Sequence, residues 1–155
     1  LARTILQKAK DRGVQLLLPV DVLVANSLES PVGTEADVYA IPEGTMALDI
    51  GPRTIALFAE QIEGAKTIFW NGPMGLFESA PFSRGTFEVA KIMSTASGFT
   101  VIGGGDSAAA VRKAGEEVAK GIDHISTGGG ASLELIEGRK LPGVEALRVN
   151  EEPAS

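Results

Sequence analysis

The sequence feature that most constrains the fold is a short apolar segment followed by a glycine-bearing turn, which occurs three times. The turns are Asn71–Gly75, Gly103–Ser107 and Thr127–Ala131, and the last two lead straight into predicted helices. Repeated strands, turns and helices predict an α/β fold with a parallel sheet. In such a sheet all three turns lie at the carboxyl edge of the strands, where ligands bind.

Hydrophobic periodicity and turn residues place the other elements. Pro52 suits the first position of a helix, and Ser83 can cap a later one. Because Leu1 and Ile5 are at helical spacing with no capping residue before them, we expect the chain to begin inside a helix. The predicted helices are Leu1–Arg12, Pro52–Ile62, Arg84–Ser97, Ser107–Lys120 and Ala131–Glu137. The predicted strands are Val14–Val24, Lys66–Trp70, Phe99–Ile102 and His124–Ser126, with a short possible strand at Val38–Ile41.

Two of the turns contain three consecutive glycines, Gly103–Gly105 and Gly128–Gly130. Glycine lets the backbone approach a ligand closely, and the free N–H groups and dipole at the start of a helix favour a phosphate. We therefore predict a phosphate site at these turns. Asp106 either caps its helix or binds Mg²⁺ together with substrate phosphates, and Ser107 either caps the helix or bonds a phosphate.

Composition excludes several classes of function. The formal charge of −6 and the pI of about 4.8 argue against binding nucleic acid or anionic membrane, since both need clustered Lys and Arg. The chain has no cysteine and a single histidine, His124, which excludes disulfides, thiolate chemistry and a His-rich metal site. We expect a cytoplasmic protein with no membrane-spanning segment.

The segment from Gly103 to Ala108 also matches the dinucleotide-binding pattern G-x-G-x-x-[GA], while the P-loop pattern is absent. The acidic residue expected about 20 positions later is Asp123, but it precedes a predicted strand instead of ending it. The position of Asp123 therefore counts against NAD binding. Glu78 is either a solvated carboxylate or an acceptor for ribose hydroxyls, and His124 is expected to be structural. The aromatic residues expected in the core are Phe69, Trp70, Phe77 and Phe82.

Four long segments resemble the phosphoglycerate kinase family: Met46–Thr54, Phe69–Glu78, Val101–Ala108 and His124–Ser132, in this order. The resemblance implies that residues 1–147 are the later part of the C-terminal, nucleotide-binding domain, with residues 148–155 as a polar tail. It implies a Rossmann-like parallel sheet with flanking helices and the strand order 3-2-1-4-5-6. In that order Val14–Val24 is similar to strand 3, and the three later strands are similar to strands 4, 5 and 6.

The resemblance also implies reversible phosphoryl transfer between 1,3-bisphosphoglycerate and MgADP, giving 3-phosphoglycerate and MgATP. Its implied adenosine site is Leu48 at adenine, with Gly72, Pro73 and Glu78 around the nucleoside and Glu78 on the ribose. Its implied phosphate and Mg²⁺ site is Gly104, Gly105, Asp106 and Ser107. The implied catalytic group is Gly128, Gly129 and Gly130, whose N–H groups face the phosphoryl group in transfer.

Parts of the family pattern are not in this sequence. The glycine turn whose lysines contact phosphate, strands 1 and 2 of the sheet, and the phosphoglycerate-binding domain with its catalytic arginine are absent. We therefore expect the chain alone to be inactive and its partner to be the remainder of the same enzyme. We also expect Val14–Val24 not to pair directly with Lys66–Trp70. Two alternatives stay open: a standalone, non-catalytic nucleotide-binding module, and an NAD-binding domain.

Overall fold

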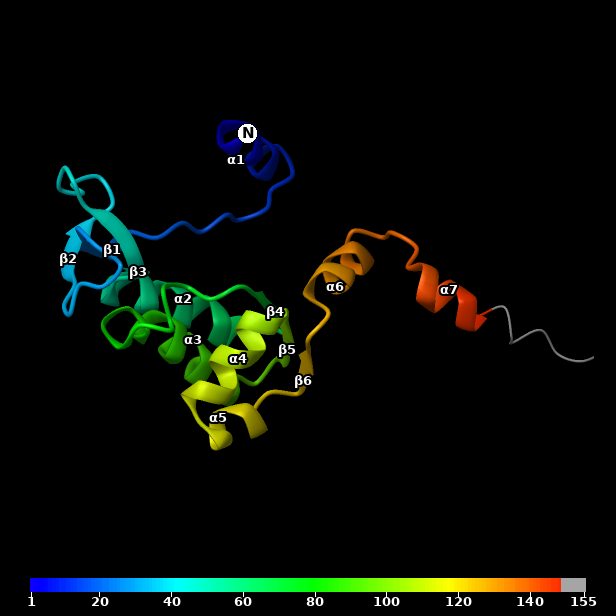
Figure 1. Ribbon diagram of the computed structural model, residues 1–155. Helices are drawn as coiled ribbons and strands as arrows, with labels where there is room; N and C mark the ends of the chain where they lie inside the picture. The colour runs from blue at the N-terminus through cyan, green and yellow to red at the C-terminus, as the bar shows by residue number, and fades with distance from the viewer. Residues whose placement is uncertain (149–155) are drawn as a thin grey trace, which may run out of the picture.

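The computed structural model describes residues 1–148, and it contains a three-stranded parallel sheet that lies at one side of a group of helices (Figure 1). The strands are β4 (Thr67–Asn71), β5 (Phe99–Gly103) and β6 (His124–Ser126), in the order β4-β5-β6. Asn71 lies beside Gly103 and Gly103 beside Ser126, so the three strands end at one edge. This confirms the predicted α/β class, an incomplete Rossmann-like sheet, and the neighbour order of its last three strands.

A second, antiparallel sheet is formed by β1 (Asp21–Ala25), β2 (Thr34–Asp37) and β3 (Met46–Ile50), in the order β2-β1-β3. The prediction of a short strand at Val38–Ile41 is wrong, since the strand in this region, β2, ends at Asp37 and residues 38–41 form a turn and a loop. β3 was not predicted as a strand. Asp49 interrupts its apolar pattern, but pairing with β1 supplies its backbone hydrogen bonds.

The prediction that Val14–Val24 forms a strand of the parallel sheet is wrong. Residues 14–20 form no strand, and residues 21–25 belong to the antiparallel sheet instead. An apolar run becomes a strand only where another strand accepts its hydrogen bonds, and this segment has no such neighbour among residues 1–148. Val14 and Leu18 are consequently 59% and 55% exposed. The related prediction, that this segment does not pair with the strand at Lys66–Trp70, is confirmed because β1 and β4 lie in different sheets.

Each predicted helix is found near its predicted position, but the observed bounds, one break and one cap differ from the prediction. The predicted helix Ser107–Lys120 divides at Gly115, whose φ of +136° breaks the helical path. Ser83 stands at the start of a helix but does not cap it, because its hydroxyl donates to the carbonyl of Ala80 at 3.0 Å. The helices are α1 (Ala2–Asp11), α2 (Pro52–Gly64), the 3₁₀ helix η1 (Ala80–Phe82), α3 (Arg84–Thr95), α4 (Gly105–Ala114), α5 (Glu116–Lys120), α6 (Gly129–Ile136) and α7 (Pro142–Arg148), the last of which was not predicted.

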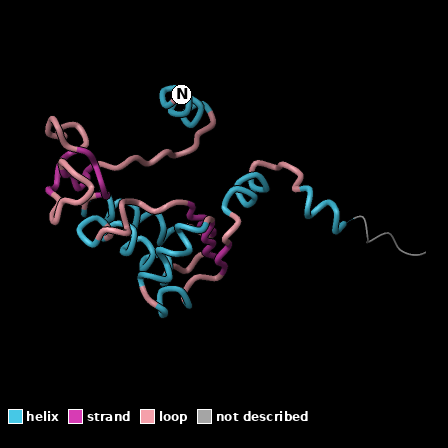
Figure 2. The backbone as a smooth tube through the Cα atoms, in the orientation of Figure 1, coloured by secondary structure: helices cyan, strands magenta, loops and turns pink. Residues whose placement is uncertain are grey.

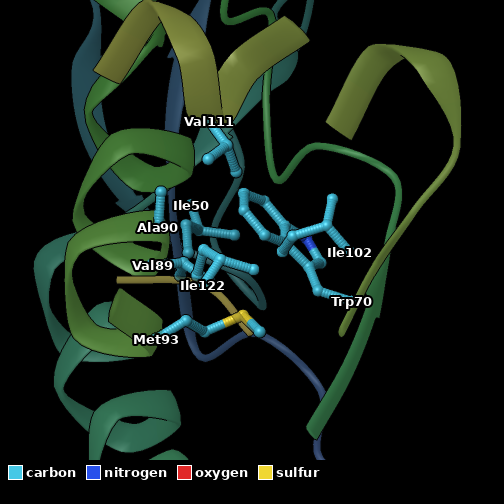
Figure 3. Packing of buried hydrophobic residues seen from close by; sticks show 8 residues of the cluster. All are labelled: Ile50, Trp70, Val89, Ala90, Met93, Ile102, Val111 and Ile122. Atoms are coloured by element: carbon cyan, nitrogen blue, oxygen red, sulfur yellow. The ribbon is translucent and has the colours of Figure 1, made fainter. Parts of the chain in front are cut away.

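The main core lies where α3 and α4 cover one face of the parallel sheet (Figure 3). Trp70 from β4 and Ile102 from β5 point into it, and Met93 closes it from α3. The predicted core positions of Trp70, Phe77 and Phe82 are confirmed, whereas Phe69 is only partly buried. The remaining members shown in Figure 3 are Ile50, Val89, Ala90, Val111 and Ile122.

The two ends of the described chain extend away from this core. α1 has no buried residue and is joined to β1 by an extended loop, and α6 and α7 follow β6 on the other side (Figure 2). No helix within residues 1–148 combines the length and apolar character needed to cross a membrane. The predicted tail at 148–155 falls almost entirely outside the described residues.

Candidate functional site

The three glycine turns meet at the carboxyl edge of the parallel sheet. A Cβ on Gly129 would lie 2.7 Å from Oδ1 of Asn71 and 2.7 Å from Cα of Gly104, so a larger residue does not fit there. The N–H of Gly104 donates to the carbonyl of Ser126 at 3.0 Å. This close packing of backbone on backbone brings the first turns of α4 and α6 together.

The start of α4 presents an open backbone. Gly104 is the N-cap residue with φ +96°, and a Cβ on Gly105 would meet no atom within 4 Å. Asp106 is exposed in the first turn and does not cap the helix, since no side chain bonds the free N–H groups. The alternative that Asp106 acts as an N-cap is therefore wrong, and its carboxylate faces solvent at the sheet edge.

The start of α6 lies next to it. The N–H of Gly128 donates to the hydroxyl of Ser126 at 3.2 Å, and the hydroxyl of Ser132 donates to the carbonyl of Gly128 at 3.0 Å. Gly129 and Gly130 form the first turn, whose N–H groups have no acceptor within the helix. A Cβ on Gly130 would meet no atom within 4 Å, so this backbone is open to a ligand.

Ser107 connects the sheet edge to the turn that follows β4. The side chain is buried, and its hydroxyl accepts a hydrogen bond of 2.7 Å from the N–H of Gly72. Neither of the two predicted roles, helix cap or phosphate contact, describes this bond. The hydroxyl orients the turn, and a contact with phosphate stays a prediction.

An open hollow of about 500 Å³ lies beside the later part of the loop that follows β4, at Met74–Glu78. Its volume is within the usual size range of ligand pockets. Leu48 from β3 and Glu78 from the loop after β4 line it together, with Val22 from β1 on a further wall. Gly72 and Pro73 begin the same loop but are not among the lining residues. The predicted adenosine residues are thus on one loop and one strand, of which Leu48 and Glu78 share the hollow.

The loop from Asn71 to Glu78 is fixed against two further elements. The N–H of Leu76 donates to the carbonyl of Leu48 at 2.8 Å, and the N–H of Met74 donates to the hydroxyl of Thr86 at 3.1 Å. Thr86 is fully buried in α3. The loop therefore links the hollow to the glycine turns.

Asp49 is a buried carboxylate that sequence reasoning missed. It accepts hydrogen bonds from the N–H of Gly85 at 2.7 Å and from the N–H of Ile50 at 2.9 Å. Burial raises the pKa of Asp49, and these two hydrogen bonds oppose the rise. Asp49 thus bonds a free N–H at the start of α3 and fixes that helix beside the hollow. The only sequence signal was an acidic residue next to Leu48 in an otherwise apolar strand.

Asp21 fixes the start of α2 in a similar way. Its carboxylate accepts from the N–H and the hydroxyl of Thr54, at 2.7 and 2.6 Å, and from the N–H of Arg53 at 2.9 Å. Burial acts to raise the pKa of Asp21, but these hydrogen bonds outweigh it and hold the pKa below its ordinary value. The second sheet is thereby joined to the helix that packs on the core.

Asp123 lies near the amino ends of the parallel strands, whereas the glycine turns lie at their carboxyl ends. Its carboxylate accepts from the N–H and the hydroxyl of Thr100, at 2.8 and 2.9 Å, near the amino end of β5. A ribose-binding acid of a dinucleotide site ends a strand at the carboxyl edge. The position of Asp123 therefore argues against NAD.

Asp106 is the candidate metal ligand, and it belongs to no metal-binding cluster among the described residues. Residues 1–148 contain no group of three or more His, Asp or Glu side chains able to hold a metal ion. An exposed single carboxylate fits Mg²⁺ that arrives with a substrate, since Mg²⁺ commonly uses one or two carboxylates together with substrate phosphates.

Taken with the fold, these features define a Rossmann-like α/β protein with its candidate ligand site at the carboxyl edge. A family model described as phosphoglycerate kinase matches residues 1–139. The phosphoglycerate kinase of Anaeromyxobacter dehalogenans strain 2CP-C is 57% identical over 147 residues, and that of Roseiflexus castenholzii is 53% identical over 148. The chain belongs to the phosphoglycerate kinase family.

Solved structures of phosphoglycerate kinases are also similar to this chain. The chain is similar to phosphoglycerate kinase from Coxiella burnetii, with a TM-score of 0.85 and 38% identity over 93% of this chain and 37% of that one. The enzyme from Pyrococcus horikoshii gives a TM-score of 0.74 and 32% identity, over 93% and 39%. The two bacterial relatives are matched over 94% and 95% of this chain and 37% of their own length. The chain thus spans little more than a third of the relatives it matches.

Proposed function

We propose that this chain forms the nucleotide-binding part of a kinase that transfers a phosphoryl group between 1,3-bisphosphoglycerate and ADP, giving 3-phosphoglycerate and ATP. The observation that carries the proposal is the convergence of the starts of α4 and α6 at the glycine turns. Two adjacent helix starts with open glycine backbones suit an extended polyphosphate better than an uncharged ligand. Membership of the phosphoglycerate kinase family supports this choice of reaction.

The nucleotide occupies the loop and the two helix starts in turn. Adenine lies against Leu48 in the hollow, and the carboxylate of Glu78 accepts from the ribose hydroxyls. Gly72 and Pro73 form the backbone wall of the loop that leads from the nucleoside to the phosphates. Gly104, Gly105 and Ser107 belong to the phosphate end. Gly128, Gly129 and Gly130 stabilise the charge on the phosphoryl group during transfer, because N–H donors aimed at its oxygens need no reorganisation.

Mg²⁺ would be held by Asp106 and the phosphates of the nucleotide. The metal supplies charge neutralisation between the phosphates. The chain's own contribution is a full negative charge in the first turn of α4, where the helix dipole also favours an anion.

The chain alone is proposed to bind nucleotide without turnover. The lysine-bearing glycine turn and the phosphoglycerate-binding domain of the family pattern are not in the sequence. The partner proposed is the remainder of the same enzyme, from residues N-terminal in the family pattern. A cytoplasmic location, with no nucleic acid or membrane as partner, stays a prediction.

The proposal is tested by calorimetric titration with MgADP and with ADP in EDTA. Asp106→Asn is expected to weaken MgADP binding roughly tenfold and ADP binding much less, because Mg²⁺ prefers a full carboxylate charge. Glu116→Gln is the control, since Glu116 is an exposed acid in the first turn of the next helix, α5. Equal losses with and without Mg²⁺ would exclude the metal role of Asp106. Binding of NAD in preference to ADP would contradict the proposed function.

A further inference from the structure

Helix α4 contacts the candidate site at both of its ends. Its first turn, at Gly105, lies at the glycine turns. Eight residues later Lys113 lies about 12 Å further along the helix, at 1.5 Å per residue. This length is on the scale of the distance between the sugar and the terminal phosphate of a nucleotide.

The ammonium group of Lys113 bonds the end of the loop that carries Glu78. Its Nζ donates to the carbonyl of Phe77 at 3.1 Å and to the carbonyl of Glu78 at 3.3 Å. It also lies 5.8 Å from the centre of the Phe77 ring, within the range of a cation–π contact. Phe77 is buried, so this contact has a fixed partner.

Lys113 forms no ion pair with a carboxylate in the part of the chain that the structure describes, unlike Lys91 and Lys120. Lys91 and Lys120 are bonded to glutamates within their own helices, as is common on a solvated surface. Lys113 instead reaches out of its helix to two consecutive carbonyls of another segment. The pattern is that of a tether between elements.

The loop from Asn71 to Glu78 is therefore bonded to α4 at two points. The hydroxyl of Ser107 accepts from Gly72 near the beginning of the loop, and Lys113 donates to Phe77 and Glu78 at its end. The β3 and α3 contacts lie between them, at Met74 to Leu76. After Leu76, Lys113 supplies the hydrogen bonds from α4 that restrain the Glu78 backbone.

We propose that Lys113 is a positioning residue that fixes the carboxylate of Glu78 relative to the phosphate end of the nucleotide site, by tethering the Glu78 loop to the helix that begins at the glycine turns. The inference rests on the proposed function, since it assigns Glu78 to the ribose and the start of α4 to the phosphates. It adds that one rigid helix sets the spacing between the two.

The experiment compares Lys113→Met with Arg112→Met, which removes an exposed charge from the neighbouring position of the same helix. Amide hydrogen exchange is measured at Phe77 and Ser79, whose N–H groups donate to the carbonyls of Gly75 and Leu76, and at Val111 in α4. Binding of ADP and of 2′,3′-dideoxyADP is measured by calorimetry. Lys113→Arg is included as the conservative variant.

Lys113→Met is expected to raise exchange at Phe77 and Ser79 about tenfold while Val111 keeps its protection, as expected for the loss of hydrogen bonds from a charged donor. It should weaken ADP several-fold and leave dideoxyADP nearly unchanged, because the dideoxy ligand cannot bond Glu78. Arg112→Met should change neither quantity, and Lys113→Arg should restore most of both.

Unchanged exchange at Phe77 and Ser79 in Lys113→Met overturns the inference, whether or not nucleotide binds. An equal loss of affinity for ADP and dideoxyADP also overturns it, since it would place the effect outside the ribose. Failure of the unmodified chain to bind ADP counts against the proposed function, and the exchange measurement still decides whether the tether exists.

Discussion

Replacing Gly85 with alanine tests how tightly α3 is fixed against β3. A Cβ at Gly85 would lie 2.5 Å from Cγ1 of Ile50 and closer still to Oδ1 of Asp49. Ordinary contacts of a Cβ begin near 3.4 Å, so the start of α3 must move by roughly 1 Å. The buried Ile50 and Asp49 side chains leave no free space for the added methyl.

The expected change in the free energy of unfolding follows from three terms. Overpacking of a buried site costs about 1–3 kcal/mol. Movement of α3 also stretches the 2.7 Å bond from the Gly85 N–H to the Asp49 carboxylate, and loss of a bond to a charged group costs about 1.5–3 kcal/mol. Alanine returns up to about 1 kcal/mol through its better helix propensity. We expect a net loss of about 2–4 kcal/mol in the free energy of unfolding.

The assay is urea unfolding followed by the fluorescence of Trp70, the single tryptophan, which is buried in the main core. Gly105→Ala is the matched control, because it also lies in the first turn of a helix and its Cβ would meet no atom within 4 Å. Gly105→Ala should leave the free energy of unfolding unchanged or raise it by up to about 1 kcal/mol, because only the helix-propensity term applies there. Two variants of equal stability would refute the packing argument.

Three further predictions concern stability and activity. Thr54→Val removes the buried hydroxyl that donates to Asp21 and should cost about 1–3 kcal/mol in urea unfolding, with exposed Thr67→Val as a near-neutral control. Hydrogen bonds from Thr100 hold the pKa of Asp123 below its ordinary value of 3.8. As acid is added, the unfolded chain therefore takes up this proton at a higher pH than the folded chain does. The stability that Asp123 contributes is full above about pH 3.8 and is lost as the pH falls through the lower pKa of the folded state. Asp123→Asn should flatten this acid limb in unfolding curves recorded from pH 5 downward, and an unchanged limb would show that other groups cause it. The pure chain should give no ATP from 1,3-bisphosphoglycerate and MgADP in a coupled assay, and measurable turnover would contradict the proposed need for the rest of the enzyme.

Elements with a strong local pattern could be predicted from the sequence. β4, β5 and β6 each combine apolar residues with a following glycine turn, and the helices that follow have clear starts, so they were placed within a few residues. The incorrect predictions concern segments whose structure depends on residues far away in the sequence. Val14–Val24 has the pattern of a buried strand, but no neighbouring strand pairs with residues 14–20. The single helix predicted at Ser107–Lys120 is divided at Gly115, whose backbone takes φ +136°.

The candidate site shows the same division. The glycine turns and their meeting edge followed from the topology, because parallel strands end together. Asp49, Lys113 and the bond between Ser107 and Gly72 could not be anticipated, since each joins segments about 35 residues apart in the chain. Their residue types carry no signal of these partners. Only the packing of α3 and α4 against the loop brings them into contact.

The exposed apolar residues between α1 and β1 affect how the protein behaves at high concentration. Val14, Leu16, Leu18 and Val20 alternate along an extended backbone, and β4 has a free edge in the described sheet. Such surfaces attract other extended chains. The net charge of −6 keeps copies apart by mutual repulsion, which salt screens over about 10 Å at 0.1 M. Dilute, low-salt buffer at a pH well above 4.8 therefore favours separate molecules, and high salt favours precipitation.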